Sequence, residues 1–149
     1  MILIFAFSSQ NAVKSSKTSG TVVTVVIETV YPNYETFPVE KQLNIIDIAT
    51  NIVRKTAHFL EYFVLGILSF FNFISFKKLK FVACTALSFA FCVLYSIADE
   101  IHQYFVPGRA CRIFDVFIDS AGSFVAIVLL VGIVLKNSKI CSKLREINA

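Results

Sequence analysis

The sequence has few charged residues over long stretches, and it lacks the basic face that typifies nucleic-acid-binding proteins. Apolar residues make up 56% of its 149 residues and its mean hydropathy is +0.73, whereas soluble domains contain about 45–50% apolar residues. Its basic residues flank apolar runs instead of alternating with polar and aromatic groups, which argues against nucleic acid as a partner. The composition therefore indicates a membrane protein of one domain, and the lipid bilayer is its first expected partner.

Several motifs that would specify a site are also absent. The four cysteines contain no CxxC pair, so their spacing suits neither a disulfide framework nor a four-thiolate zinc site. The chain has no HExxH motif. The first residues lack the basic start and the small-residue cleavage site of a signal peptide. We interpret the four cysteines as small apolar residues without a specific chemical role: Cys84, Cys92, Cys111 and Cys141.

Three apolar runs are long enough to cross the ~30 Å hydrocarbon layer as helices, for which about 20 residues are needed. They lie at 58–76, 81–98 and 113–135. The initial run at 1–7 is far too short to cross, and we expect it to be the remnant of a truncated first membrane helix. The sequence thus predicts an all-α, polytopic membrane helix bundle with three full spans, forming one domain over 1–149.

The segment 8–57 is expected to be an outer loop that contains an interfacial helix. Residues 8–20 are rich in serine, lysine and asparagine and are typical of a polar loop. Residues 21–30 are mostly β-branched, which fits either a strand or a short interfacial helix. From Val39 to Thr56 apolar residues recur among polar ones, which predicts an amphipathic helix lying at the membrane interface.

Basic residues give the expected orientation. Lys77, Lys78 and Lys80 fill the gap between two apolar runs, and further basic residues crowd the tail at 136–149. Loops of this kind are cytoplasmic under the positive-inside rule. We therefore expect a multi-pass protein of the cell membrane with a cytoplasmic C-terminus, with Cys111 outside and Cys141 inside.

Three helix ends each carry a pair of polar residues on one face, because residues three or four apart are neighbours on a helix. Asp119 lies two turns into an apolar run, and an intramembrane carboxylate is by default a functional hypothesis. The orientation places all of these groups outside. The candidate catalytic residues in this cluster are His58, Glu61, Asp99, Glu100, His102, Asp115 and Asp119.

The cluster suits more than one chemistry. Imidazole and carboxylate pairs are suited to general acid–base catalysis, and mixed nitrogen and oxygen ligands suit a divalent ion such as zinc or manganese. The sequence leaves the cofactor and the metal unknown. Arginine binds phosphate or carboxylate through two hydrogen bonds, so a lipid-linked phosphate is a sensible ligand. The basic residues on this side are Arg54, Lys55, Arg109 and Arg112, and a simpler role for them is anchoring at the interface.

Three separated stretches resemble the signature blocks of the VanZ-like family: RKTAHFLEY at 54–62, YSIADEIHQYFVPGR at 95–109 and DVFIDSAG at 115–122. FSSQ at 7–10 resembles the family's segment at the exit of its first membrane helix. The family is named for a protein associated with teicoplanin resistance in Gram-positive bacteria, and its members are small polytopic membrane proteins. The resemblance implies that its recurrent polar positions are Lys55, His58, Glu61, Tyr62, Asp99, Glu100, His102, Gln103, Arg109, Asp115 and Asp119.

Two functions are expected from the resemblance and the cluster together. The first is to lower susceptibility to teicoplanin-type lipoglycopeptides at the outer leaflet, by masking or excluding the drug. The second is an enzyme acting on a lipid-linked precursor of the cell envelope, whose candidate substrate-binding residues are Arg54, Lys55, Tyr62, Gln103 and Arg109. A proton- or ion-coupled transporter is less favoured, because three or four helices form a narrow conduit unless the protein oligomerises.

Overall fold

The structure is a computed structural model that describes residues 12–76, 79–106 and 112–137, with side chains from residue 20 onward. These residues form helices and no strand, so the predicted all-α fold is confirmed. The first-helix remnant at 1–7, Lys77 and Lys78, Arg109 and Cys111, and most of the tail at 136–149 lie outside the described residues. The elements are α2 (Ala12–Val30), a 3₁₀ turn η1 (Tyr34–Thr36), α3 (Val39–Ile74), α4 (Phe81–Tyr104) and α5 (Ile113–Lys136).

Three of these helices, α3, α4 and α5, are long and apolar enough to cross a membrane. Many of their large apolar side chains point outward, including Val82, Phe114 and Phe117. Exposed apolar surface on this scale is unfavourable in water and is expected where a helix faces lipid. The three predicted spans are confirmed, and the protein is a multi-pass membrane protein.

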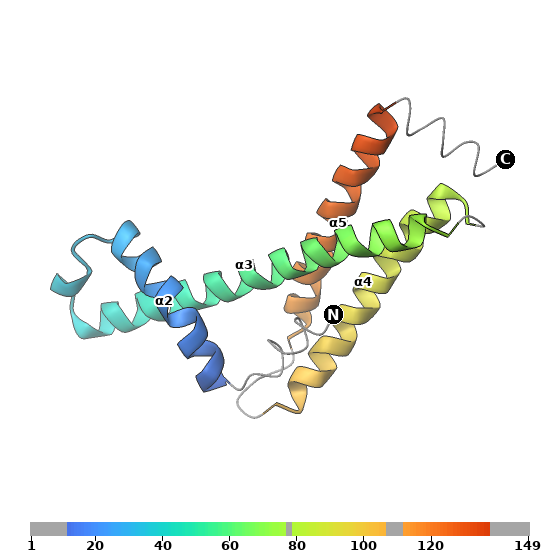
Figure 1. Ribbon diagram of the computed structural model, residues 1–149. Coiled ribbons are helices and arrows are strands. Elements are labelled where there is room, and N and C mark those ends of the chain that lie inside the picture. The colour runs from blue at the N-terminus through green and yellow to red at the C-terminus, as the bar shows by residue number, and fades with distance from the viewer. Residues whose placement is uncertain (1–11, 77–78, 107–111, 138–149) are drawn as a thin grey trace.

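The first span is longer than the sequence predicted. The amphipathic segment from Val39 and the span at 58–76 are not separate, because α3 runs without a break through both. The segment has no proline, and its first glycine is Gly66, so nothing in the local sequence stops the helix. At 1.5 Å per residue, 36 residues extend about 54 Å. α3 is therefore longer than the hydrocarbon layer is thick, and its first half extends beyond the bundle (Figure 1).

The prediction of a polar loop at 8–20 is wrong from Ala12 onward, because α2 begins there. The β-branched run that follows is helical. Thr24 and Thr29 donate their hydroxyls to the carbonyl oxygens four residues earlier, which satisfies these side chains within a helix. Val23 and Ile27, four residues apart, bury one face of α2 against Ala49 of α3. This packing stabilises a helix that local propensity alone does not favour.

α3 contacts both α4 and α5, which contact each other, whereas α2 packs against α3 (Figure 1). The crossing of α3 and α5 is close because it contains glycine. A Cβ atom on Gly66 would lie 2.9 Å from the Ser123 carbonyl oxygen, and one on Gly122 would collide with the carbonyl oxygen of Phe59. Small residues allow this approach in membrane bundles. The backbones of α3 and α5 are thereby brought together beside the polar residues of both helices.

Candidate functional site

Asp119 lies where α3, α4 and α5 meet. Its side chain is 1% exposed. The hydroxyl of Ser96 on α4 donates a hydrogen bond of 2.8 Å to Asp119 Oδ2. His58 Nδ1 on α3 lies 3.8 Å from Asp119 Oδ1, which is an ion pair when the imidazole is protonated. Three polar groups that are far apart in the sequence thus meet at one buried point.

Three further carboxyl groups surround Asp119. Asp99 and Glu100 on α4 and Asp115 on α5 are all buried, and each is close enough to interact with Asp119 electrostatically. We call these four residues the acidic cluster. Ionised together, they would repel one another in surroundings that screen charge poorly. Such a cluster is costly to hold, so packing alone does not explain it.

Part of the cluster is held by hydrogen bonds from α4 and from the start of α5. Gln103 Nε2 donates to Asp99 Oδ2 at 3.1 Å, one turn along the same helix. The backbone N–H of Arg112 donates to Glu100 Oε2 at 2.8 Å, just where α5 begins. Asp99, Glu100 and Gln103 lie in the last turns of α4, which continues to Tyr104, beyond the span predicted at 81–98. The end of α4 is thus joined to the beginning of α5 through an acidic side chain.

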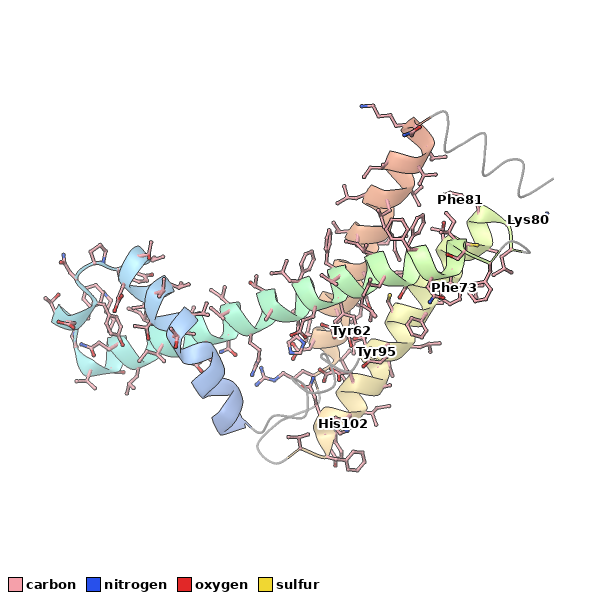
Figure 2. The ribbon with its side chains drawn as sticks, in the orientation of Figure 1. Tyr62, Phe73, Lys80, Phe81, Tyr95 and His102 are labelled. Carbon is pink, nitrogen blue, oxygen red and sulfur yellow. The ribbon has the colours of Figure 1, made fainter. Side chains whose placement is uncertain are left out.

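Other oxygen atoms in the same region make no hydrogen bond within the described residues. They are the Oδ1 atoms of Asp99, Asp115 and Asp119. Tyr62 is 0% exposed and interacts electrostatically with both Asp119 and Asp99. Figure 2 shows it on α3 beside Tyr95 of α4, with His102 further toward the end of α4. Buried polar oxygens without partners are rare in proteins and call for an explanation, of which a binding or catalytic role is one.

The remaining predicted residues lie around this centre with less burial. Glu61 and His102 are half-buried, on α3 and α4. Arg54 is half-buried one turn before His58, and its guanidinium donates to Asn51 Oδ1 at 3.2 Å. Lys55 and Arg112 are exposed. The structure therefore brings the carboxyl groups and His58 together, and it leaves the described basic residues nearer the surface.

No three of the histidine, cysteine, aspartate or glutamate side chains in 20–76, 79–106 and 112–137 are placed so that they could hold a metal ion. Imidazole–carboxyl chemistry and hydrogen bonding are what this arrangement supplies directly. His58 Nδ1 lies 3.8 Å from Asp119 Oδ1, which is longer than a hydrogen bond but close enough for an electrostatic interaction. The Tyr62 hydroxyl is a donor to any acceptor that reaches the cluster.

Sequence reasoning missed Ser96, which is fully buried and binds the central carboxyl group. Its position three residues before Asp99 puts both on one face of α4, and that spacing was the available signal. For Tyr62, the only indication in the sequence is the family resemblance. The structure gives it an independent reason, since its hydroxyl is buried beside two carboxyl groups.

No curated protein matches the chain, and no solved structure matches it. A family model described as VanZ/LLP1 matches residues 1–136, which include every helix of the structure and the whole acidic cluster. The protein therefore belongs to the VanZ/LLP1 family of membrane proteins.

Proposed function

We propose that the protein lowers the susceptibility of a Gram-positive cell to teicoplanin-type lipoglycopeptides, acting through the acidic cluster at the outer side of the cell membrane. The observation that carries the proposal is the Asp119 carboxyl group, buried at the contact of three helices with Ser96 and His58 beside it. Family membership supports the antibiotic phenotype, since the family's namesake is associated with teicoplanin resistance.

The proposed orientation rests on the positive-inside rule. The basic turn that includes Lys80 precedes α4, and Lys136 ends α5. The acidic cluster lies at the other ends of the same two helices, so a cytoplasmic turn puts the cluster outside. Thiol labelling of intact cells tests this, with Cys111 expected to react from outside and Cys141 only after permeabilisation. The reverse labelling would put the cluster in the cytoplasm and contradict the proposal.

Burial of the cluster bears on how the protein would act. A protein that only masks a drug needs an exposed apolar surface, and burying carboxyl groups adds nothing to that task while costing several kcal/mol for each ionised group. We therefore propose, as the second candidate function, that the protein is an enzyme acting on a lipid-linked precursor of the cell envelope. Reduced drug susceptibility would then follow from a change in that precursor.

In this enzymatic proposal, His58 exchanges a proton with the substrate and Asp119 orients and stabilises its imidazole. Their 3.8 Å separation leaves room for the pair to tighten when a substrate binds. Arg54, Lys55 and Arg109 hold a phosphate, and Tyr62 and Gln103 contribute hydrogen bonds. Further acid–base candidates in the same cluster are Glu61, Asp99, Glu100, His102 and Asp115.

The test is the teicoplanin susceptibility of a sensitive Gram-positive host that expresses the chain. Wild type is compared with Asp119→Asn and His58→Ala at equal amounts in the membrane. Glu40→Gln is the matched control, because it also changes a carboxylate to an amide, is exposed, and lies about 27 Å along α3 from His58. We expect wild type and Glu40→Gln to raise resistance and the two cluster variants to abolish it.

The outcomes separate the alternatives. Full resistance from both cluster variants would contradict a chemical site and leave masking of the drug as the mechanism. Absence of resistance from correctly inserted wild type would contradict the antibiotic proposal. An effect of Glu40→Gln as large as that of Asp119→Asn would show that the loss is not specific to the cluster.

A further inference from the structure

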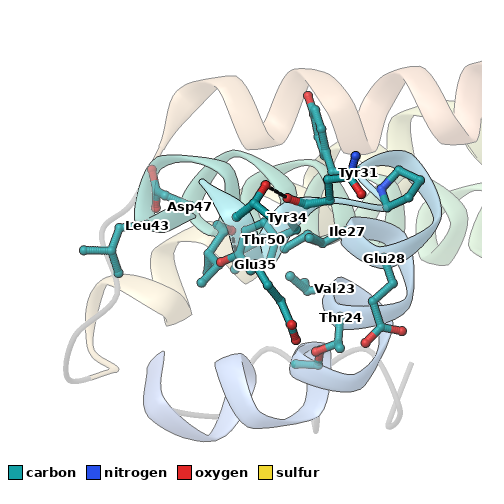
Figure 3. Close-up of a pocket in the computed structure, with 15 residues that line it drawn as sticks. Val23, Thr24, Ile27, Glu28, Tyr31, Tyr34, Glu35, Leu43, Asp47 and Thr50 are labelled. Carbon is teal, nitrogen blue, oxygen red and sulfur yellow. Dashed lines mark hydrogen bonds between the residues drawn. The ribbon is translucent and has the colours of Figure 1, made fainter. Parts of the chain in front are cut away.

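A cavity lies apart from the acidic cluster, in the hairpin formed by α2, η1 and the first half of α3 (Figure 3). Its volume is about 900 Å³, which is within the usual size range of small-molecule sites, about 300–1,000 Å³. The lining ends at Thr50, two turns of α3 before His58, and shares no residue with the acidic cluster. We call this cavity the hairpin groove. Its role is not accounted for by the function proposed above.

Part of the lining of the hairpin groove is apolar. Val23 and Ile27 are buried in it and pack on Ala49, forming its floor. Leu43 and Ile46 of α3 also line the groove, and both have exposed side chains. The apolar surface thus continues from the buried floor to the outside of the hairpin, and an apolar chain placed along it would be removed from water.

Among the residues whose side chains are described, the charged ones that line the groove are acidic: Glu28, Glu35 and Asp47. In Figure 3, Glu28 and Glu35 point to the same side of the groove, near Thr24, while Asp47 lies at the other end near Leu43. All three side chains are exposed. Exposed carboxylates are too costly to place in hydrocarbon, so the charged mouth of the groove faces water.

The hairpin is already held in shape by hydrogen bonds across its connection. Gln42 Nε2 donates to the carbonyl oxygens of Glu35 at 3.2 Å and Phe37 at 2.9 Å. The Tyr34 hydroxyl donates to the Gln42 carbonyl oxygen at 3.2 Å. Lys41 lies over the Phe37 ring, 3.8 Å from its centroid, and is not among the lining residues. A groove formed in advance loses less entropy when a ligand binds.

We propose that the hairpin groove binds a water-soluble cationic amphiphile, with an ammonium group between Glu28 and Glu35 and an apolar chain along Val23, Ile27 and Ile46. The acidic mouth selects for positive charge and repels anionic amphiphiles. The apolar floor selects for a hydrocarbon segment next to that charge. The proposal does not depend on the chemistry of the acidic cluster, and its failure would leave the proposed function untouched.

The experiment uses the full chain in phosphatidylcholine nanodiscs and two photoreactive probes. One is a medium-chain alkylammonium with a diazirine in its chain, and the other is identical except that a hydroxyl replaces the ammonium. Empty nanodiscs give the background from partition into lipid. We expect saturable cross-linking of the ammonium probe to the peptides that contain α2 and the first half of α3, and much weaker cross-linking of the hydroxyl probe.

Two variants test the charge and the floor separately. The double variant Glu28→Gln/Glu35→Gln should weaken binding of the ammonium probe roughly fivefold, because it removes two exposed ion pairs that each contribute little. Ile46→Ser should weaken the binding of both probes. Glu40→Gln should change the binding of neither, because Glu40 is an exposed acid of the same hairpin that does not line the groove. Equal labelling by the two probes, or unchanged binding in the double variant with its helix content intact, would overturn the proposal.

Discussion

The acidic cluster and the hairpin groove each hold three or more carboxyl groups, but under opposite conditions. In the groove, Glu28, Glu35 and Asp47 are exposed, so water solvates them and salt screens their repulsion. In the cluster, the side chains of Asp99, Glu100, Asp115 and Asp119 are only 1–7% exposed. They are shielded from water, and Asp119 interacts electrostatically with the other three. The same chemical group is inexpensive in one region and costly in the other.

The difference shows which region the fold must hold in place. The cluster depends on contributions from three helices, including the Ser96 hydroxyl, the Gln103 amide and the backbone N–H of Arg112. The groove depends on one hairpin that packs on itself. Substitutions near the cluster should therefore affect the whole bundle, whereas substitutions in the hairpin should act locally. Three variants test this comparison.

The largest effect is expected from Gly122→Ala, at the crossing of α3 and α5. The added Cβ would collide with the Phe59 backbone, which cannot move aside as a flexible side chain can. We expect a loss of about 3 kcal/mol in the free energy of unfolding, as for overpacked cores, or failure to insert. Gly132→Ala on the same helix meets nothing within 4 Å and should be neutral. Thermal unfolding of the two purified variants in detergent distinguishes them, and equal stability would contradict the close crossing.

An intermediate effect is expected from Ser96→Ala, which removes the donor to Asp119 Oδ2. Since Asp119 Oδ1 makes no hydrogen bond in the described structure, the variant would leave both oxygens without one, at a cost of about 1–3 kcal/mol. Ser88→Ala is the matched control on α4. Its hydroxyl donates to the carbonyl oxygens of Cys84 and Ser69, so its loss should cost about 1 kcal/mol or less. If chemical unfolding showed the same loss in the free energy of unfolding for both variants, the hydrogen bond to Asp119 would contribute no more than an ordinary one.

The sequence predicted the three spans because their apolar runs are long and uninterrupted, which is a local property. It also predicted that pairs such as Asp115 and Asp119 share a face, since helical spacing alone determines this. It left residues 21–30 open between a strand and a helix, and it divided α3 into two segments. The helical state of α2 depends on contact between segments, namely Val23 and Ile27 against Ala49, whereas α3 is continuous because no proline interrupts it.

At the centre of the candidate site, too, the sequence does not reveal the contacts between helices. The sequence indicates Asp119 because a carboxylate within an apolar run is unusual. It does not indicate Ser96, because serine is common in membrane helices and its role depends on the contact between α4 and α5. Which of the clustered residues act on a substrate stays a prediction, and the variants proposed above test it.

The smallest effect is expected from Gln42→Ala in the hairpin. The variant removes the amide that donates to the carbonyl oxygens of Glu35 and Phe37, but both acceptors are near water and can be solvated. We expect a local loss of about 1 kcal/mol, seen as faster amide hydrogen exchange between α2 and α3. Exchange in α4 and α5 should not change. In the described structure, α2 makes extensive contact with α3 but not with α4 or α5.

Gln42→Ala also decides whether the two regions are independent. If the hairpin only carries its own groove, the variant should weaken alkylammonium binding while leaving teicoplanin susceptibility as in wild type. α3 is one continuous helix from Val39 to Ile74, however, so it is a direct physical connection between the groove and His58. Faster exchange in α5, or a change in susceptibility at equal protein levels, would contradict independence and show that loosening the hairpin reaches the cluster through α3.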